Sequence, residues 1–284
     1  MRTLTVIGLG RLGRSVARLA AQSGGCRIAQ LAGRSLPALE EARAFVGEGE
    51  PVALGGALRP ADLYLLAVPD GAIAECAQRL ADHVDLPAGA VAFHASGVGD
   101  AGLLAPLARR GLRVASLHPA YSFADPARAA AGFAGTLCAL EGEAEACETL
   151  SAFAVDIGGR PFRLAEGGKP AYHAALSVAS NYLVTLAAMA ERLAAEGGVP
   201  EALLRPLLGN LMRQSLDNAL ALGPRAALTG PVSRGDAGTV ARHLQAMRDP
   251  GLIEAYRAMG RQTMALAGER LDAEARRRLA ALLG

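Results

Sequence analysis

The chain has 284 residues, which is long enough for two domains, because single hydrophobic cores stop growing at roughly 250–300 residues. Hydrophobic residues make up 51% and charged residues 20%, so the chain is expected to fold compactly and to be no disordered linker. The formal net charge of +2 is spread along the chain and there is no Trp, which argues against a nucleic-acid-binding surface.

The first 165 residues alternate short β-branched runs with amphipathic stretches, a pattern typical of a mostly parallel sheet with helices on both faces. This pattern predicts the α/β fold class of the Rossmann type. We expect strands at 3–7, 27–31, 51–54, 63–68, 90–94, 112–117 and 135–140, with a short run at 160–164. Helices are expected between them at 11–22, 37–46, 71–83, 101–109 and 143–156.

After residue 165 the strand-like runs end, and long Ala, Leu, Arg and Glu stretches at helical period continue to the end. We therefore predict two domains, 1–165 and 166–284, of which the second is all-helical. Its helices are expected at 169–196, 200–222, 236–247, 250–267 and 272–283. The apolar segment 174–195 contains Asn181, Glu191 and Arg192, so we expect a buried helix rather than a membrane span.

The four cysteines form no CxxC pair and have no nearby His at zinc-ligand spacing, so no metal site is expected. They are typical of reduced, mostly buried thiols in a cytoplasmic protein. The chain begins MRTLTVIGLG, which leaves no room for a secretion signal before the first motif. A cytoplasmic location is therefore expected.

A glycine-rich turn, GLGRLG, follows the first expected strand and opens the first expected helix, which is the context that a dinucleotide fingerprint requires. Gly8 permits the tight turn, Gly10 lets the backbone approach the pyrophosphate, and Gly13 allows close packing of helix on strand. The pyrophosphate is expected against the N–H groups at the helix N-terminus. The predicted cofactor contacts here are Gly8, Leu9, Gly10, Arg11, Leu12 and Gly13.

The end of the second strand indicates which dinucleotide binds. Arg34 and Ser35 stand about 20 residues beyond Gly13, where an NAD-preferring site places an acidic residue for the ribose 2′-OH. A guanidinium and a hydroxyl suit a 2′-phosphate instead, so the predicted cofactor is NADP(H). The alternative is an ordinary surface arginine in a loop.

Three further strand ends carry candidate residues. The fourth strand runs into AVPDGAI, so Val68 and Pro69 are expected beside the cofactor, although Pro69 could simply end the strand and Asp70 cap the next helix. The motif FHASG supplies His94 and Ser96, and SLHPAYSF supplies His118 and Tyr121. A strand-end histidine acts either as a general acid or as a hydrogen-bonded loop residue. The predicted roles are catalysis, cofactor binding and substrate positioning for Ser96, catalysis and substrate binding for His118, and substrate binding for Tyr121.

The stretch GGKPAYHAALSVASNYL opens the helical domain. Lys169, His173, Ser177 and Asn181 follow one another at four-residue spacing and would share one helix face, with Tyr172 nearby. Such a polar stripe indicates a wet pocket or a network between helices. We predict Lys169 or His173 as the proton donor for a hydride transfer, with Asn181 also catalytic and Tyr172 and Ser177 binding substrate.

The loop LTGPVSRGD offers one more candidate. Arg234 could clamp a substrate carboxylate, whereas Asp236 could simply cap the next helix.

Taken together in this order, GLGRLG, AVPD, FHASG, LHPAYSF, KPAYHAALSVASNYLV and TGPVSRGD resemble an uncharacterised Rossmann-like family with a helical C-terminal domain of unknown function. Its members are usually labelled NADP- or deazaflavin-dependent oxidoreductases. More distantly the chain is similar to pyrroline-5-carboxylate reductase, ketopantoate reductase, and the 6-phosphogluconate and β-hydroxyacid dehydrogenases. The β-hydroxyacid dehydrogenases place an Asn four residues after a catalytic Lys, whereas His173 stands at that spacing here.

The resemblance implies a Rossmann domain followed by an all-α domain of the 6-phosphogluconate dehydrogenase C-terminal type, which would form a homodimer. It also implies NADP(H)-dependent hydride transfer to or from a small carbonyl, imine or hydroxyacid metabolite, with neither nucleic acid nor membrane as partner. Two alternatives stay open. One is a non-catalytic NADP(H)-binding sensor, and the other is an NADP oxidoreductase with a deazaflavin acceptor.

Overall fold

The computed structural model describes residues 1–53, 55–83 and 85–284 and divides into two compact units, Met1–Ser180 and Asn181–Gly284. Leu54, the last residue of the strand predicted at 51–54, lies outside the described residues. The predicted boundary after residue 165 marks the change from strands to helices. The first unit extends further because Lys169, at the start of the next helix, bonds to the strand ends of the sheet.

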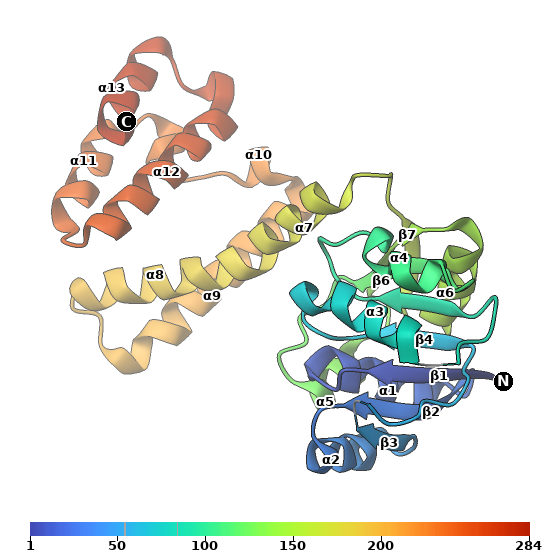
Figure 1. The fold of residues 1–284 in the computed structure, drawn as a ribbon. Helices are drawn as coiled ribbons and strands as arrows, with labels where there is room; N and C mark the ends of the chain where they lie inside the picture. Colours follow the sequence, from blue (N-terminus) through green and yellow to red (C-terminus); the bar gives the residue numbers. More distant parts are fainter. Residues whose placement is uncertain (54, 84) are drawn as a thin grey trace. The chain divides into compact units, whose positions relative to one another are not determined.

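Eight strands form one sheet in the first unit: β1 Arg2–Ile7, β2 Cys26–Gly33, β3 Glu50–Ala53, β4 Leu63–Leu66, β5 Val91–His94, β6 Arg113–Pro119, β7 Leu137–Gly142 and β8 Arg160–Arg163. Their order is β3-β2-β1-β4-β5-β6-β7-β8, and all neighbours are parallel except β6 and β7 (Figure 1). The strand order reverses between β1 and β4. In open α/β sheets a ligand binds at such a reversal, outside the carboxyl ends of the strands.

Helices cover both faces of this sheet: α1 Arg11–Ser23, α2 Leu36–Val46, α3 Ile73–His83, α4 Ala105–Ala108, α5 Pro126–Gly132 and α6 Ala144–Asp156, with 3₁₀ turns η1 Asp70–Ala72 and η2 Ala101–Leu104. Strand side chains alternate between the faces. In β4, Leu63 and Leu65 pack in one core with α1, α2 and α6, whereas Tyr64 and Leu66 pack in the other with α3 and α4. The sheet is therefore a buried layer between two helical layers.

Most predicted elements of this unit are confirmed, with three differences. The helices predicted at 71–83 and 101–109 each begin with a 3₁₀ turn, and the strand predicted at 63–68 ends at Leu66. Helix α5 was not predicted. Its start is encoded locally, because Asp125 accepts a hydrogen bond from the Arg128 N–H (2.8 Å) and Pro126 stands in the first turn.

A long helical run leads from the first unit into the second. It consists of α7 Lys169–Ser177, the π-helical turn η3 Val178–Tyr182 and α8 Leu183–Glu196. A π turn contains more residues than an α turn, so the run is not one regular α-helix between Ser177 and Asn181. Lys169, His173 and Ser177 lie on α7, whereas Asn181 lies in the π turn.

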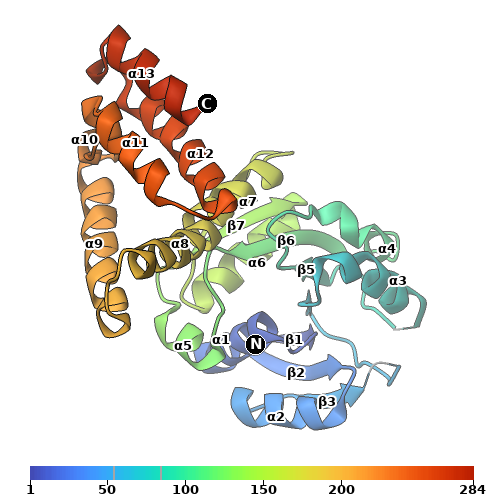
Figure 2. The same cartoon turned by 90° about the vertical axis from the view of Figure 1, so that its left-hand side faces the viewer.

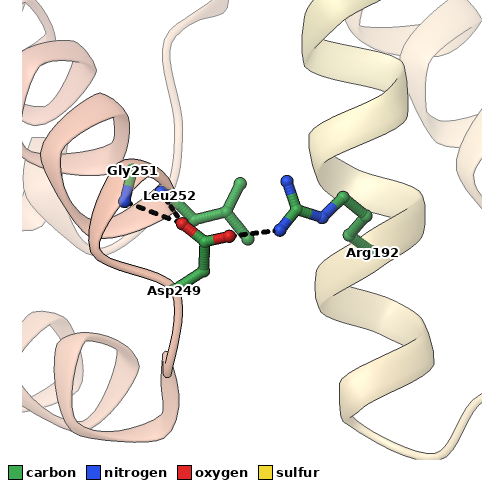
Figure 3. A network of polar contacts seen from close by, with 4 residues as sticks. All are labelled: Arg192, Asp249, Gly251 and Leu252. Carbon is green, nitrogen blue, oxygen red and sulfur yellow. Dashed lines mark hydrogen bonds and ion pairs between the residues drawn. The ribbon is translucent and has the colours of Figure 1, made fainter.

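The second unit continues with α9 Glu201–Leu222, α10 Pro224–Ala227, η4 Val232–Arg234, α11 Ala237–Ala246, α12 Pro250–Ala267, η5 Gly268–Arg270 and α13 Ala273–Leu283. Its small core lies among η4, α11, α12 and α13, around Val240, Leu279 and Leu283. Asp249 fastens the start of α12, because its carboxylate accepts from the N–H groups of Gly251 (2.7 Å) and Leu252 (3.1 Å) and pairs with Arg192 of α8 (Figure 3). One ion pair thus joins α8 to α12.

Helices α8 and α9 follow one another and contact each other (Figures 1 and 2). None of their residues, all of which the structure describes, is buried. The expectation of a buried helix at 174–195 is therefore wrong for the single chain. Large apolar side chains are exposed along both helices: Leu183, Val184, Leu186, Leu203, Leu207, Leu211, Leu216, Leu220 and Leu222.

Candidate functional site

The glycine turn between β1 and α1 contains two glycines that the protein's own packing requires. Gly8 has φ +96°, and a Cβ built on it would lie 2.5 Å from the Ala67 carbonyl oxygen. A Cβ on Gly13 would lie 2.0 Å from the Gly8 carbonyl oxygen. Neither distance is possible for a real side chain, so these two residues hold α1 against β1 and β4.

Gly10 differs from its neighbours. Its φ of −69° suits any residue, and a Cβ built on it would meet nothing within 4 Å. The packing of the protein therefore does not explain this glycine. Gly10 is also the N-cap of α1, and no side chain caps that helix end among the described residues. A bare backbone in front of free N–H groups fits a pyrophosphate.

Arg14 braces this turn from behind. Its Nε donates to the Leu9 carbonyl (2.9 Å) and its Nη2 donates to the Ala38 carbonyl in α2 (3.3 Å). The guanidinium thus ties the glycine turn to the helix that follows Arg34 and Ser35. Both of those residues are exposed just after β2, and the Ser35 hydroxyl makes no cap hydrogen bond to α2. Both stand directly after the second strand, where the sequence predicts a contact with the 2′-phosphate.

Val68 and Pro69 follow β4 on the way to η1, and Val68 is half-buried whereas Pro69 is exposed. Asp70 does not cap a helix with its side chain. Its carboxylate instead accepts a hydrogen bond from the Ser96 hydroxyl (2.8 Å), which in turn accepts from the Gly99 N–H (2.8 Å). The loops after β4 and β5 are therefore locked together, and Ser96 faces Asp70.

Lys169 is buried, with 3% of its surface exposed. Its Nζ donates to the Ser96 carbonyl (2.8 Å) and to the Ser116 hydroxyl (2.6 Å), so the first turn of α7 is fastened to β6 and to the loop after β5. Ser116 then lies 3.4 Å from Glu141 Oε2 on β7. Burial lowers the Lys169 pKa to about 8, and the carboxylates of Glu141, Asp100 and Asp70 oppose this shift.

The amino-acid composition of the chain also marks this position. Of the 29 Lys and Arg residues in the chain, Lys169 is the only lysine. A chain that uses arginine everywhere else keeps a compact ammonium at one buried place, where the planar five-donor guanidinium has a different shape and different donors.

His118, Tyr172 and His173 form a cluster of aromatic rings that contact one another. His118 Nδ1 is hydrogen-bonded to the Tyr172 hydroxyl (3.0 Å), and the rings of His118 and His173 are nearly perpendicular with centroids 6.1 Å apart. Gly97 makes room for both imidazoles, because a Cβ on it would lie 2.3 Å from His173 Cδ2 and 2.9 Å from His118 Nε2. Gly97 is thus a site residue that the sequence reading missed.

Burial determines the charge of these groups. It lowers the His118 pKa to about 4, and the positive charges of Lys169 and His173 act in the same direction. It raises the Tyr172 pKa to about 12. At neutral pH the cluster therefore holds a neutral His118 imidazole and a protonated Tyr172 phenol.

His94 is the last residue of β5, and it is fully buried. Its Nδ1 accepts from the Ser96 N–H (3.1 Å) and its Nε2 is 2.9 Å from the Asp100 carbonyl, which fixes one neutral tautomer. Burial lowers its pKa to about 4. Of the two readings that the sequence left open for a strand-end histidine, His94 takes the structural one.

The remaining predicted site residues lie elsewhere. Tyr121 packs its ring against Phe123 and Phe133 and is not part of the histidine cluster. Ser177 is half-buried at the end of α7. Asn181 and Arg234 belong to the second unit, and Arg234 is exposed. Asp236 caps α11 by accepting from the Thr239 N–H, as one reading of that loop expected.

Comparisons with known proteins agree with this architecture. Residues 2–119 match the family model of a Rossmann-like domain, and residues 136–263 match that of a domain of unknown function, DUF2520. The chain therefore combines a Rossmann-like domain with a DUF2520 domain, which confirms the predicted resemblance and fold class. No curated protein matches the chain.

Solved structures similar to the chain include protein TM1727 from Thermotoga maritima, at 26% identity and a TM-score of 0.70, over 93% of this chain and 98% of that one. A candidate NADP oxidoreductase, BF3122 from Bacteroides fragilis, is 22% identical with a TM-score of 0.76 over the same shares. An imine reductase from Myxococcus stipitatus, a variant in complex with NAD⁺, is 17% identical with a TM-score of 0.66, over 100% of this chain and 99% of that one. The last two likenesses show that the fold is shared.

Proposed function

We propose that the chain is an NADP(H)-dependent oxidoreductase that transfers a hydride to or from a small carbonyl, imine or hydroxyacid compound. The observation that carries the proposal is Gly10, an N-cap glycine with open space where a side chain would be. It stands at the point where a Rossmann sheet binds the pyrophosphate. Neighbours of the same fold that are named as reductases or NADP oxidoreductases support the same class of reaction.

The second part of the proposal is the polar cluster at the carboxyl ends of β5 and β6. When bound, NADP(H) supplies or accepts the hydride, and a reduced carbonyl or imine then needs a proton from the protein. Lys169, His118, Tyr172 and His173 bring titratable groups to this edge. Ser96 links this group of residues to Asp70, the first residue of η1 after β4. Asn181 and Arg234 remain candidates for substrate contacts.

Arg34 and Ser35 make NADP(H) the preferred cofactor, because both are exposed beyond β2 where the adenosine 2′-phosphate would lie. Calorimetric titration of NADPH and NADH into the wild type and an Arg34→Ala, Ser35→Ala variant tests this. We expect the wild type to prefer NADPH by at least about tenfold and the variant to lose that preference. Arg110→Ala, at an exposed position before β6, is the control. Absence of binding by either nucleotide would contradict the proposal.

Turnover separates an enzyme from a sensor. Purified protein is screened with NADPH against small aldehydes, ketones, cyclic imines and 2-oxoacids, with oxidation of the nicotinamide followed by absorbance. Reduction of one class defines the substrate. Tight NADPH binding with no turnover in the whole panel would favour the non-catalytic sensor.

The four thiols carry no disulfide, which supports a location in the reducing cytoplasm.

We also propose that the chain acts as a homodimer through α8 and α9. The run Lys169–Glu196 is long and apolar enough to span a membrane by composition, and its apolar window is entirely unburied. Apolar faces of this extent need a partner. Sedimentation of the wild type is expected to give a dimer, and Leu207→Glu with Leu211→Glu a monomer. Val155→Glu, exposed on α6, is the control. A monomeric wild type, or one that binds lipid vesicles, would contradict this.

A further inference from the structure

We infer that Lys169 is a positioning residue, which fastens α7 to the strand ends and so sets the His118–Tyr172 hydrogen bond, and that the proton comes from His173. The inference rests on the proposed reductase function, because it assigns roles within that reaction. It turns on which of the two candidate donors has a face open to a ligand.

Lys169 has no such face. Its side chain is 3% exposed, and the two oxygens that its ammonium contacts belong to Ser96 and Ser116, which are also buried. A proton donor must touch the reacting atom or a water beside it. The ammonium instead contacts Ser116 of the sheet, which lies two residues before His118 on β6.

The surroundings of Lys169 explain why it is an ammonium that is held there. Glu141 on β7 lies beside Ser116 and also accepts from the Ala101 N–H (2.9 Å) at the start of η2. Asp70 reaches the same group through Ser96. One buried cation is thus balanced by carboxylates on separate elements, and buried charges require such partners. The Lys169 ammonium, Ser96, Ser116 and these carboxylates thus form one network that joins α7, β6, β7, η1 and η2.

His173 stands one helical turn beyond Lys169, so fixing the lysine fixes the direction in which this imidazole points. It is half-buried, and it packs beside Gly97 where a methyl group would collide with it. Tyr172 packs its ring on Phe162 of β8 and holds His118 Nδ1. His118, Tyr172 and His173 are each half-buried, so of the two candidate donors it is His173, and not the buried Lys169, that has a face open to a ligand.

The other two members do not suit the donor role at neutral pH. Burial keeps the His118 pKa at about 4, so its imidazole is neutral there, and the Tyr172 hydroxyl is already hydrogen-bonded to His118 Nδ1. The titratable groups that act on His118 are Lys169 and His173 on α7, His94 on β5 and Asp70 on η1, and Tyr172 is hydrogen-bonded to it. Imidazole is the side chain best suited to proton transfer near neutral pH.

The proposed reduction of a carbonyl or imine conserves atoms and electrons. A hydride from NADPH carries its electron pair to the carbonyl or imine carbon, and the π pair of that bond moves to the oxygen or nitrogen. That atom takes the proton of the His173 imidazolium, which leaves a neutral imidazole. Water then returns a proton to His173. One NADPH and one proton are consumed, and NADP⁺ and an alcohol or amine are formed.

The positioning role is tested first on the full chain without substrate, by ¹⁵N-histidine NMR of side-chain tautomers. We expect the wild type to show a fixed His118 tautomer, Lys169→Met to show a mixed one, and Ser116→Ala to show a smaller change in the same direction. His173→Gln should leave the His118 signals in place. If Lys169→Met is folded by near-ultraviolet dichroism and keeps the wild-type His118 signals, the positioning role is overturned.

The proton assignment is tested by the pH profile of kcat/KM for the substrate found in the screen. His173→Gln should lower kcat at least about 100-fold and abolish the alkaline limb of the profile, where activity falls as the donor loses its proton, with NADPH affinity unchanged. Lys169→Met should keep that limb at reduced height. Loss of the limb in Lys169→Met alone would make Lys169 the donor. A wild type that binds no NADPH would overturn the proposed function and the His173 role, whereas the His118 spectra would still decide the positioning role.

Discussion

Gly97 shows how closely the site is built. Its missing side chain is the space in which His118 and His173 meet, since a Cβ there would lie 2.3 Å from one ring and 2.9 Å from the other. Such distances force backbone or side-chain movement. Nothing in the motif FHASG distinguishes this glycine from a turn former, because the histidines that it accommodates come from β6 and α7.

Gly97→Ala should therefore displace both imidazoles. We expect kcat to fall by at least about tenfold, because misplacement by about 1 Å costs up to 100-fold, while NADPH affinity stays within about threefold. Steady-state kinetics and calorimetry measure the two effects. Gly238→Ala in α11, where a Cβ meets only Asp236 Oδ1 at 3.6 Å, is the matched control. Unchanged kcat in Gly97→Ala would mean that the cluster does not take part.

At the scale of elements, the sequence predicts the features that follow a local pattern and misses those that depend on pairing or on one irregular turn. The alternation of strands and helices and the glycine turn are local patterns, so the order of elements and the nucleotide turn could be predicted. The antiparallel β7 could not, because pairing direction depends on which edge is free after β6 is placed. The π turn at 178–182 is likewise invisible to a four-residue count.

The same limit applies to the site. Ser96, His118 and Lys169 were predicted because each follows a strand or opens a helix in a recognisable motif. Asp70 and Glu141 were not, since their roles depend on the Ser96 and Ser116 hydroxyls, which other strands bring to them. Tyr121 misled in the opposite way, because an aromatic residue in a polar motif also suits the core that α5 completes.

Asp249 gives a test at this scale. It caps α12 and pairs with Arg192, and this pairing holds the pKa of the Asp249 carboxyl below its usual range. Asp249→Ala should lower the midpoint of thermal unfolding, because cap and ion pair are both lost. Asp249→Asn should lower it less, because an amide oxygen still caps the helix. Equal losses in the two variants, measured by calorimetry, would show that the ion pair alone stabilises this contact.

For the whole molecule, the lowered pKa values of His94 and His118 predict how stability depends on pH. Their folded pKa values of about 4 lie below the ordinary histidine value of 6.5, so between these pH values the unfolded chain binds more protons than the folded one. The free energy of unfolding should therefore fall as pH decreases from 6.5 to 4. Urea titrations at pH 7 and pH 5 measure it, and His118→Gln should reduce the difference. A constant free energy over this range would contradict the buried neutral state.

The central claim is that the bare backbone at Gly10 exists for a dinucleotide. The most direct measurement is calorimetric titration of NADPH into Gly10→Ala beside its thermal unfolding. The account predicts that Gly10→Ala unfolds at the wild-type temperature or higher, because its Cβ meets no protein atom, but binds NADPH at least about tenfold more weakly. Gly13→Ala should instead lose stability, since its Cβ would lie 2.0 Å from the Gly8 oxygen. Wild-type NADPH affinity in a folded Gly10→Ala protein would contradict the account.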